Sequence, residues 1–84
     1  MKFKEIGGFI TAKEYKITGD VNTDFSEWHL DKNAEYDEID SFYDFDAVRI
    51  AEGEDGKTYA VSMIYSSPKQ KHLPMIWAEI EELK

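Results

Sequence analysis

The stretch "DAVRIAEGEDGKTYAVSMIY", residues 46–65, constrains the fold of this chain more than any other. Asp55-Gly56 favours a two-residue type I′ turn, in which both central residues have positive φ. Such a turn places Ile50 opposite Val61. Because side chains alternate along a strand, this pairing gives the hairpin one apolar face. Its members are Val48, Ile50, Tyr59, Val61, Met63 and Tyr65. The sequence therefore predicts an antiparallel hairpin packed mainly on one side.

The N-terminal segment "KFKEIGGFITAKEYKITGD", residues 2–20, predicts a second hairpin. Gly7-Gly8 can form its turn, and β-branched and aromatic residues on either side favour strands. Gly19-Asp20 is typical of a chain reversal, so the second strand should end there.

The C-terminal segment "HLPMIWAEIEELK", residues 72–84, predicts a helix. Pro74 suits the first helical position, where its missing N–H costs little. Ile76, Ile80 and Leu83, together with Trp77, follow the helical period of 3.6 residues. The glutamates between them would then face water.

The central stretch "EYDEIDSFYDFD", residues 35–46, alternates acids with aromatic rings and contains no basic residue. As a helix it places Tyr36, Ile39 and Tyr43 on one stripe and three aspartates on another. As a strand it places Ile39, Tyr43 and Phe45 on one face. Both periods fit, so helix and strand stay open for residues 34–46. Either period predicts rings turned inward and carboxylates turned outward.

The predicted fold class is α+β, in a single domain spanning residues 1–84. We expect a four-stranded antiparallel sheet from two hairpins, with a C-terminal helix and one or two short central helices packed on it. Within "TDFSEWHLDKN", Asp24 stands three residues before Glu27, the spacing of a capping box, which indicates a short helix carrying Phe25 and Trp28 inward. The expected sheet–helix core consists of Val48, Ile50, Val61, Met63, Trp77, Ile80 and Leu83.

The length and the cysteine content of the chain limit which classes of protein it can belong to. A chain of 9.8 kDa buries roughly 64% of its unfolded surface on folding, which suffices for one core. The chain has no cysteine, whereas secreted domains of this size are commonly held by disulfides, so we expect a cytoplasmic protein. No apolar run approaches the roughly 18 residues of a membrane span, and the first residues lack the apolar core of a signal peptide.

The charge of the chain is strongly asymmetric. Between Asp20 and Asp55 lie thirteen acidic and two basic residues, a net charge of −11. The rest of the chain carries five acids and eight lysines, or +3, which leaves −8 overall. A negative balance disfavours DNA, RNA and acidic lipid as direct partners and favours a basic protein surface.

The sequence contains no motif for nucleophilic catalysis, phosphate binding or metal binding, and its many carboxylate pairs would need burial in a cleft to serve as acid and base. There is no cysteine nucleophile and no Gly-x-Ser-x-Gly elbow. His29 and His72 each stand alone and are interpreted as structural, and Gly7-Gly8 lacks the lysine and helix start of a phosphate loop. The stretch "DEIDSFYDFDAV" has neither the glycine nor the spacing of a calcium loop. We expect a protein that is not an enzyme and has no cofactor and no metal site.

Three hypotheses for the acidic block follow. It can be a solvated surface that keeps a small domain soluble, or a docking surface for a basic protein. It can also be a nucleic-acid mimic that inhibits a nucleic-acid-binding protein, and small acidic inhibitors of phages and mobile elements are similar in size and charge. We expect a non-enzymatic binding protein, monomeric or homodimeric, that engages a basic protein surface, with nucleic-acid mimicry as the sharper hypothesis. The alternative is a domain whose acidic surface serves solubility or docking to a protein partner without mimicry. The predicted partner-binding residues are Glu35, Tyr36, Asp37, Glu38, Asp40, Tyr43, Asp44 and Asp46.

Overall fold

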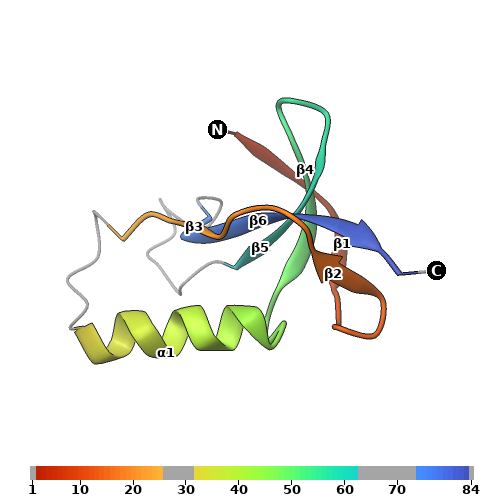
Figure 1. The fold of residues 1–84 in the computed structure, drawn as a ribbon. Coiled ribbons are helices and arrows are strands. Elements are labelled where there is room, and N and C mark those ends of the chain that lie inside the picture. Colours follow the sequence, from red (N-terminus) through yellow and green to blue (C-terminus); the bar gives the residue numbers. More distant parts are fainter. Residues whose placement is uncertain (1, 26–31, 63–73, 84) are drawn as a thin grey trace.

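The computed structural model describes residues 2–25, 32–62 and 74–83. Within these ranges one helix accompanies a single antiparallel sheet of six strands (Figure 1). The elements in chain order are β1 (Phe3–Phe9), β2 (Tyr15–Ile17), β3 (Asn22–Thr23), α1 (Lys32–Tyr43), β4 (Arg49–Gly53), β5 (Thr58–Ser62) and β6 (Ile76–Glu82). The strand order is β1-β4-β5-β6-β2, and β3 pairs with β6 as well.

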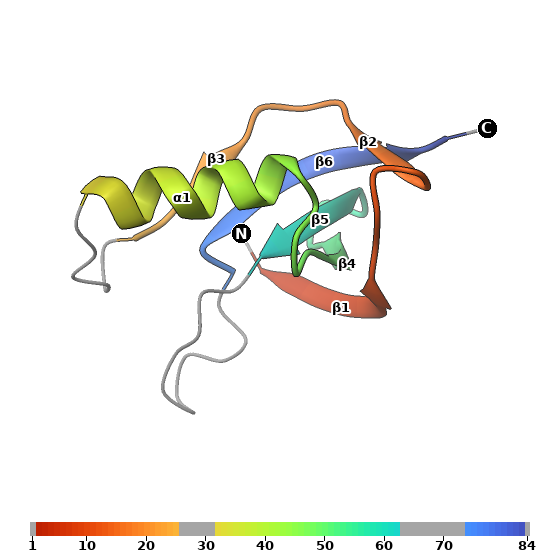
Figure 2. The same cartoon turned by 90° about the horizontal axis from the view of Figure 1, so that it is seen from below.

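The helix α1 covers one face of this sheet. It runs along the β6 side, as the view from below shows (Figure 2). The main core lies between them and consists of Ile10, Phe42, Val48, Ala60, Ile76, Ala78 and Ile80. The far face of the sheet, turned away from α1, carries a smaller cluster. Its members are Ala51, Tyr59 and Val61, with Phe3 and Trp77 packed against them.

The predicted C-terminal helix is wrong, because residues 76–82 form strand β6. Ile76, Ala78 and Ile80 alternate with Trp77 and Glu79, so the segment satisfies a period of two as well as the helical period. The three alternating apolar residues are at most 4% exposed. As a strand, the segment pairs with β5 on one side and with β2 and β3 on the other, and a helix could not use these backbone partners. The sheet therefore has more strands than the four predicted.

The predicted N-terminal hairpin is also wrong. Residues 3–9 form one continuous strand that pairs with β4, and the chain turns later, at residues 11–14. Gly7 marks a close approach of strands β1 and β4 rather than a turn. A Cβ built on Gly7 would lie 2.6 Å from Cγ2 of Ile50, within a stretch where the β1–β4 register shifts.

This close approach predicts that Gly7→Ala destabilises the protein by about 1–3 kcal/mol, the usual cost of forcing an extra methyl group into a packed site. The branched Ile50 side chain has little rotamer freedom with which to move aside. Gly8→Ala is the matched control, since no atom lies within 4 Å of a Cβ at that position. Urea denaturation of both variants tests this prediction, and equal midpoints would contradict it.

The central hairpin is confirmed, but its predicted register is wrong by one residue. Ile50 lies opposite Ala60 rather than Val61. The loop is longer than predicted: the Gly53 N–H donates to the Lys57 carbonyl and the Gly56 N–H to the Gly53 carbonyl, each at 2.9 Å. In this loop only Gly56 has a positive φ, of 81°. These features describe a three-residue loop that ends in a left-handed glycine.

The changed register redistributes the predicted core between the two faces. Because a one-residue slip flips side chains relative to the partner strand, Val61 lies on the far face while Val48 and Ile50 face α1. Trp77 belongs to the far-face cluster too, and Leu83 is 41% exposed. Met63 lies outside the described residues, as do Trp28 and the rest of the predicted short helix after Phe25.

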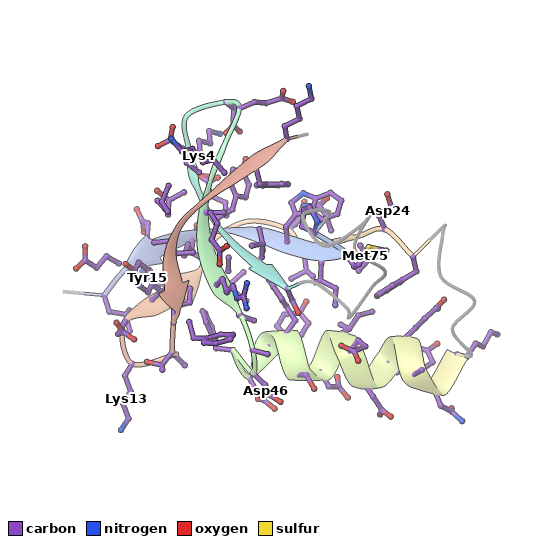
Figure 3. All side chains as sticks on the ribbon, turned by 180° about the vertical axis from the view of Figure 1, so that it is seen from behind. Lys4, Lys13, Tyr15, Asp24, Asp46 and Met75 are labelled. Atoms are coloured by element: carbon purple, nitrogen blue, oxygen red, sulfur yellow. The ribbon has the colours of Figure 1, made fainter. Side chains whose placement is uncertain are left out.

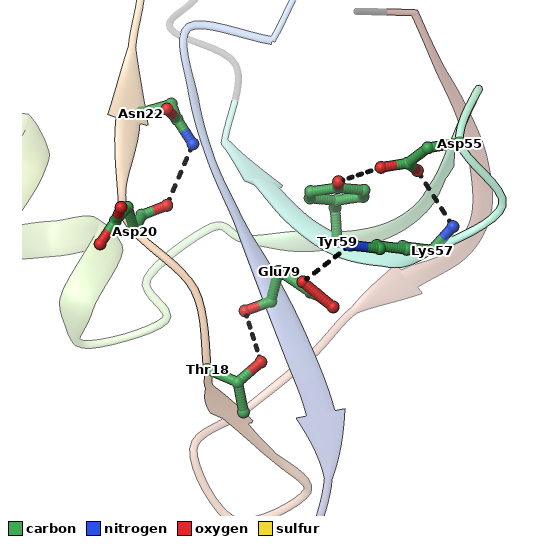
Figure 4. A network of polar contacts seen from close by, with 7 residues as sticks. All are labelled: Thr18, Asp20, Asn22, Asp55, Lys57, Tyr59 and Glu79. Carbon is green, nitrogen blue, oxygen red and sulfur yellow. Dashed lines mark hydrogen bonds and ion pairs between the residues drawn. The ribbon is translucent and has the colours of Figure 1, made fainter.

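The hairpin loop is held by a short hydrogen bond on the far face (Figure 4). The Tyr59 hydroxyl donates to Oδ2 of Asp55 at 2.5 Å, and the Lys57 N–H donates to Oδ1 of the same carboxylate at 3.0 Å. The bond from Tyr59, followed by that from Lys57, holds the pKa of Asp55 below its usual value of 3.8. The same carboxylate raises the pKa of Tyr59 to about 12.

These pKa shifts predict two pH limits for the hairpin. The depressed pKa of Asp55 means that its contribution to folding is present above about pH 4 and is lost as the pH falls through the folded-state pKa. The raised pKa of Tyr59 means that its contribution is present below pH 10.0 and is lost as the pH rises through about 12. Asp55→Asn should remove the acid limit and lower the pKa of Tyr59. Thermal unfolding between pH 5 and 2 and an ultraviolet titration of tyrosine measure both effects; unchanged values would contradict the contact.

Candidate functional site

Most of the acidic stretch is helical, because it lies in α1. The helix ends in a Schellman motif: the Phe45 N–H donates to the Phe42 carbonyl and the Asp46 N–H to the Ser41 carbonyl, both at 2.9 Å. The left-handed position of this motif, usually glycine, is occupied by Phe45 with φ of 58°. The Phe45 ring packs against the main core, which offsets the backbone strain. The end of α1 is therefore tied to the core.

Ala47 is a second left-handed residue, with φ of 55°, and its side chain is exposed. A non-glycine residue in this conformation costs roughly 1–2 kcal/mol, while glycine costs roughly 0.5–1 kcal/mol through the unfolded chain. We therefore expect Ala47→Gly to stabilise the protein by about 0.5–1 kcal/mol, because no packing is lost. A higher urea midpoint would agree with this expectation, and a lower one would contradict the strained backbone.

The inward side of α1 is formed by two apolar residues. Phe42 is 1% exposed and lies in the main core, and Ile39 packs against that core three residues earlier. This spacing places both side chains on one side of a helix. The prediction that the rings of the acidic stretch turn inward is thus confirmed for Phe42 and Phe45 and wrong for two tyrosines.

The outward face of α1 consists of Tyr36, Asp37, Asp40, Tyr43 and Asp44. Tyr36 is 63% exposed and Tyr43 is 55% exposed, and the three aspartates are exposed as well. Asp40 lies four residues after Tyr36 and three before Tyr43, spacings that make it a neighbour of both on the helix surface, while the Tyr43 ring also contacts the Phe42 ring edge to face at 6.5 Å. Asp37 and Asp44 lie beside this row and span about 10 Å of helix axis. Rings and carboxylates therefore share one surface.

The other predicted site residues are placed differently. Glu35 and Glu38 are half-buried and lie one turn before Ile39 and Phe42, towards the inward side of α1. Asp46 is exposed in the turn after the helix, where it points away from the sheet, while Lys4 lies on the opposite side of the molecule (Figure 3). The structure thus brings together five of the eight predicted residues, places Asp46 near their end, and separates the two glutamates from them.

Ion pairs within the described ranges lie on the sheet. They join Lys16 to Glu81, Arg49 to Glu5 and Lys57 to Glu79. In these ranges no basic side chain pairs with an acid on the outward face of α1, and the helix itself has one basic residue, Lys32, in its first turn. The negative charge of this face is therefore not neutralised by the part of the chain that the structure describes.

One arrangement on the far face of the sheet was missed by the sequence analysis. Arg49 Nη1 lies 3.2 Å from Oε1 of Glu5, and its guanidinium lies 4.9 Å from the centre of the Phe9 ring. Phe9 is 65% exposed. The guanidinium is thus held by a carboxylate and an aromatic ring together. Phe9 lies opposite Arg49 in the β1–β4 pairing, and the sequence gives no sign of that pairing.

Two surface hollows of the described ranges lie away from α1. One hollow of about 260 Å³ lies beside Lys2, Lys4, Glu52 and Glu54, and another of about 500 Å³ lies beside Lys16, Glu81 and Leu83. Neither includes a residue of α1. No three carboxylate or imidazole side chains of residues 2–25, 32–62 and 74–83 converge in a way that could hold a metal ion.

Comparison of the chain with protein-family models, with curated proteins and with solved structures gave no match. In the part of the chain that the structure describes, no helix has both the length and the apolar character needed to span a bilayer.

Proposed function

We propose that this chain is a non-enzymatic binding protein that engages a basic surface of a protein partner through the outward face of α1. The observation that carries the proposal is the exposure of Tyr36 and Tyr43 in one row with Asp40. Tyrosine supplies contact area at an interface, and surrounding carboxylates steer a basic partner and select against acidic ones. The cytoplasm is the proposed compartment, because the chain has no cysteine.

The two exposed rings also distinguish docking from the other hypotheses. A surface that serves solubility gains nothing from exposed aromatic rings. A mimic of duplex DNA needs a dense anionic array, and DNA carries about one charge per 1.7 Å of axis. The outward face carries three aspartates over about 10 Å, interrupted by the rings. Docking is therefore the function that this surface supports best.

The proposal is tested by capture from a cell lysate at low and high salt. The baits are the native protein and a Tyr36→Ala/Tyr43→Ala variant, which has the same net charge of −8. A protein bound by the native bait, released by salt and lost with the variant supports docking. A protein that both baits retain reflects bulk charge and contradicts it. Added DNA separates the mechanisms: competition by DNA indicates mimicry, and its absence indicates docking alone.

A further inference from the structure

The outward face of α1 carries the two kinds of group that bind an arginine side chain, namely aromatic rings and a carboxylate. Two exposed rings flank one carboxylate, at helical spacings that leave about 5–6 Å between neighbouring Cβ atoms. A planar guanidinium can stack on a ring and at the same time donate N–H groups from its edge to a carboxylate. An ammonium group is a compact and strongly hydrated charge, so it gains less from the ring.

The far face of the sheet already contains this combination in complete form. There Arg49 is held by the Glu5 carboxylate at 3.2 Å and the Phe9 ring at 4.9 Å, although all three residues are at least partly exposed. The structure therefore contains this combination of groups on a partly exposed surface. On α1, Tyr36 and Tyr43 supply the rings and Asp40 the carboxylate, and no basic side chain of the described ranges pairs with Asp40.

We infer that the outward face of α1 binds an arginine-bearing segment of its partner and selects arginine over lysine. The occupant is a cationic protein segment, which fits the unneutralised negative charge of this face. Each ring receives one guanidinium by stacking, and the aspartates one turn away on the helix accept its N–H groups. This inference rests on the proposed function and specifies the partner of the same surface.

The test uses two fluorescein-labelled peptides of equal length and charge, one alternating arginine with glycine and the other alternating lysine with glycine. Fluorescence anisotropy at low salt measures the affinity of the native protein for each. We expect the arginine peptide to bind about fivefold tighter for each stacked guanidinium. In Tyr36→Leu/Tyr43→Leu the preference should fall towards one, while Tyr36→Phe/Tyr43→Phe should keep it, because Phe retains the ring. Circular dichroism verifies that both variants are folded.

The possible outcomes separate this inference from the proposed function. Equal affinities for the two peptides, lost together in Asp37→Asn/Asp40→Asn/Asp44→Asn, would overturn arginine selection and leave the basic docking surface in place. A preference for arginine that survives the leucine variant would show that the rings are not its source and would also overturn the inference. Binding of neither peptide at low salt would overturn both proposals.

Discussion

Phe42→Ala is expected to lower the free energy of unfolding by about 3–5 kcal/mol, the range for truncating a large aromatic residue in a core. Phe42 is 1% exposed and is the only fully buried residue of α1. Its ring joins the helix to the residues of β5 and β6 in the main core. A domain of this length has a total stability of about 4–13 kcal/mol, so the loss takes a large fraction of it.

Tyr36→Ala is the matched control, because Tyr36 is an aromatic residue of the same helix and is 63% exposed. Its truncation should change the free energy of unfolding by no more than about 0.5 kcal/mol. Urea denaturation followed by circular dichroism compares the two variants. Similar losses in both would mean that α1 does not rest on the sheet through Phe42.

Reversing the three aspartates of the outward face, in Asp37→Lys/Asp40→Lys/Asp44→Lys, should weaken partner binding by about 100-fold or more. Each reversal replaces attraction to a basic surface with repulsion, and like charges at an interface cost several kcal/mol together. The fold should persist. Lysine is a better helix former than aspartate, and removing acids from the last turn of α1 relieves an unfavourable interaction with the helix dipole.

A second triple variant controls for net charge. Asp20→Lys, Glu52→Lys and Glu82→Lys change exposed acids outside α1. Each reversal adds two charges, so either triple variant carries −2 in place of −8. Binding measured by anisotropy with the arginine peptide should survive this control. Equal losses in the two triple variants would show that total charge, and no particular surface, determines binding.

Part of the fold was accessible from the sequence because its determinants are local. Asp55-Gly56 and the alternation on either side of it predict a hairpin, and the structure contains it. Its register was not accessible, since the loop has three residues and only Gly56 adopts a positive φ. Gly7 was misread for a different reason. Glycine serves both turns and close backbone approach, and only the position of Ile50, far along the chain, distinguishes them.

The C-terminal strand shows how tertiary pairing decides between two periods. Ile76, Trp77 and Ile80 fit a helix, whereas Ile76, Ala78 and Ile80 fit a strand, and both patterns are present in the same seven residues. The neighbouring strands β5 and β2 provide backbone partners on both edges, so the strand is favoured. No local propensity contains that information.

The candidate site was predicted in outline and corrected in detail. The sequence located it in the acidic stretch, because charge and aromatic content are visible without a structure. The sequence did not reveal which rings point inward, since Tyr36, Phe42 and Tyr43 are all apolar enough to be assigned to the core. The helical period places Phe42 with Ile39, and the two tyrosines then face solvent beside the aspartates. The outward face of α1 therefore exposes Tyr36 and Tyr43, which were among the predicted partner-binding residues, together with the aspartates.

The most direct measurement locates the binding surface on the native protein. The arginine peptide is added to 15N-labelled protein, and the backbone amide shifts are followed by nuclear magnetic resonance. We expect the largest changes within residues 36–44, with small changes at Glu52, Glu79 and Glu81 on the sheet. Changes of similar size at acids over the whole molecule, or changes centred on the sheet, would contradict the claim that α1 carries the binding surface.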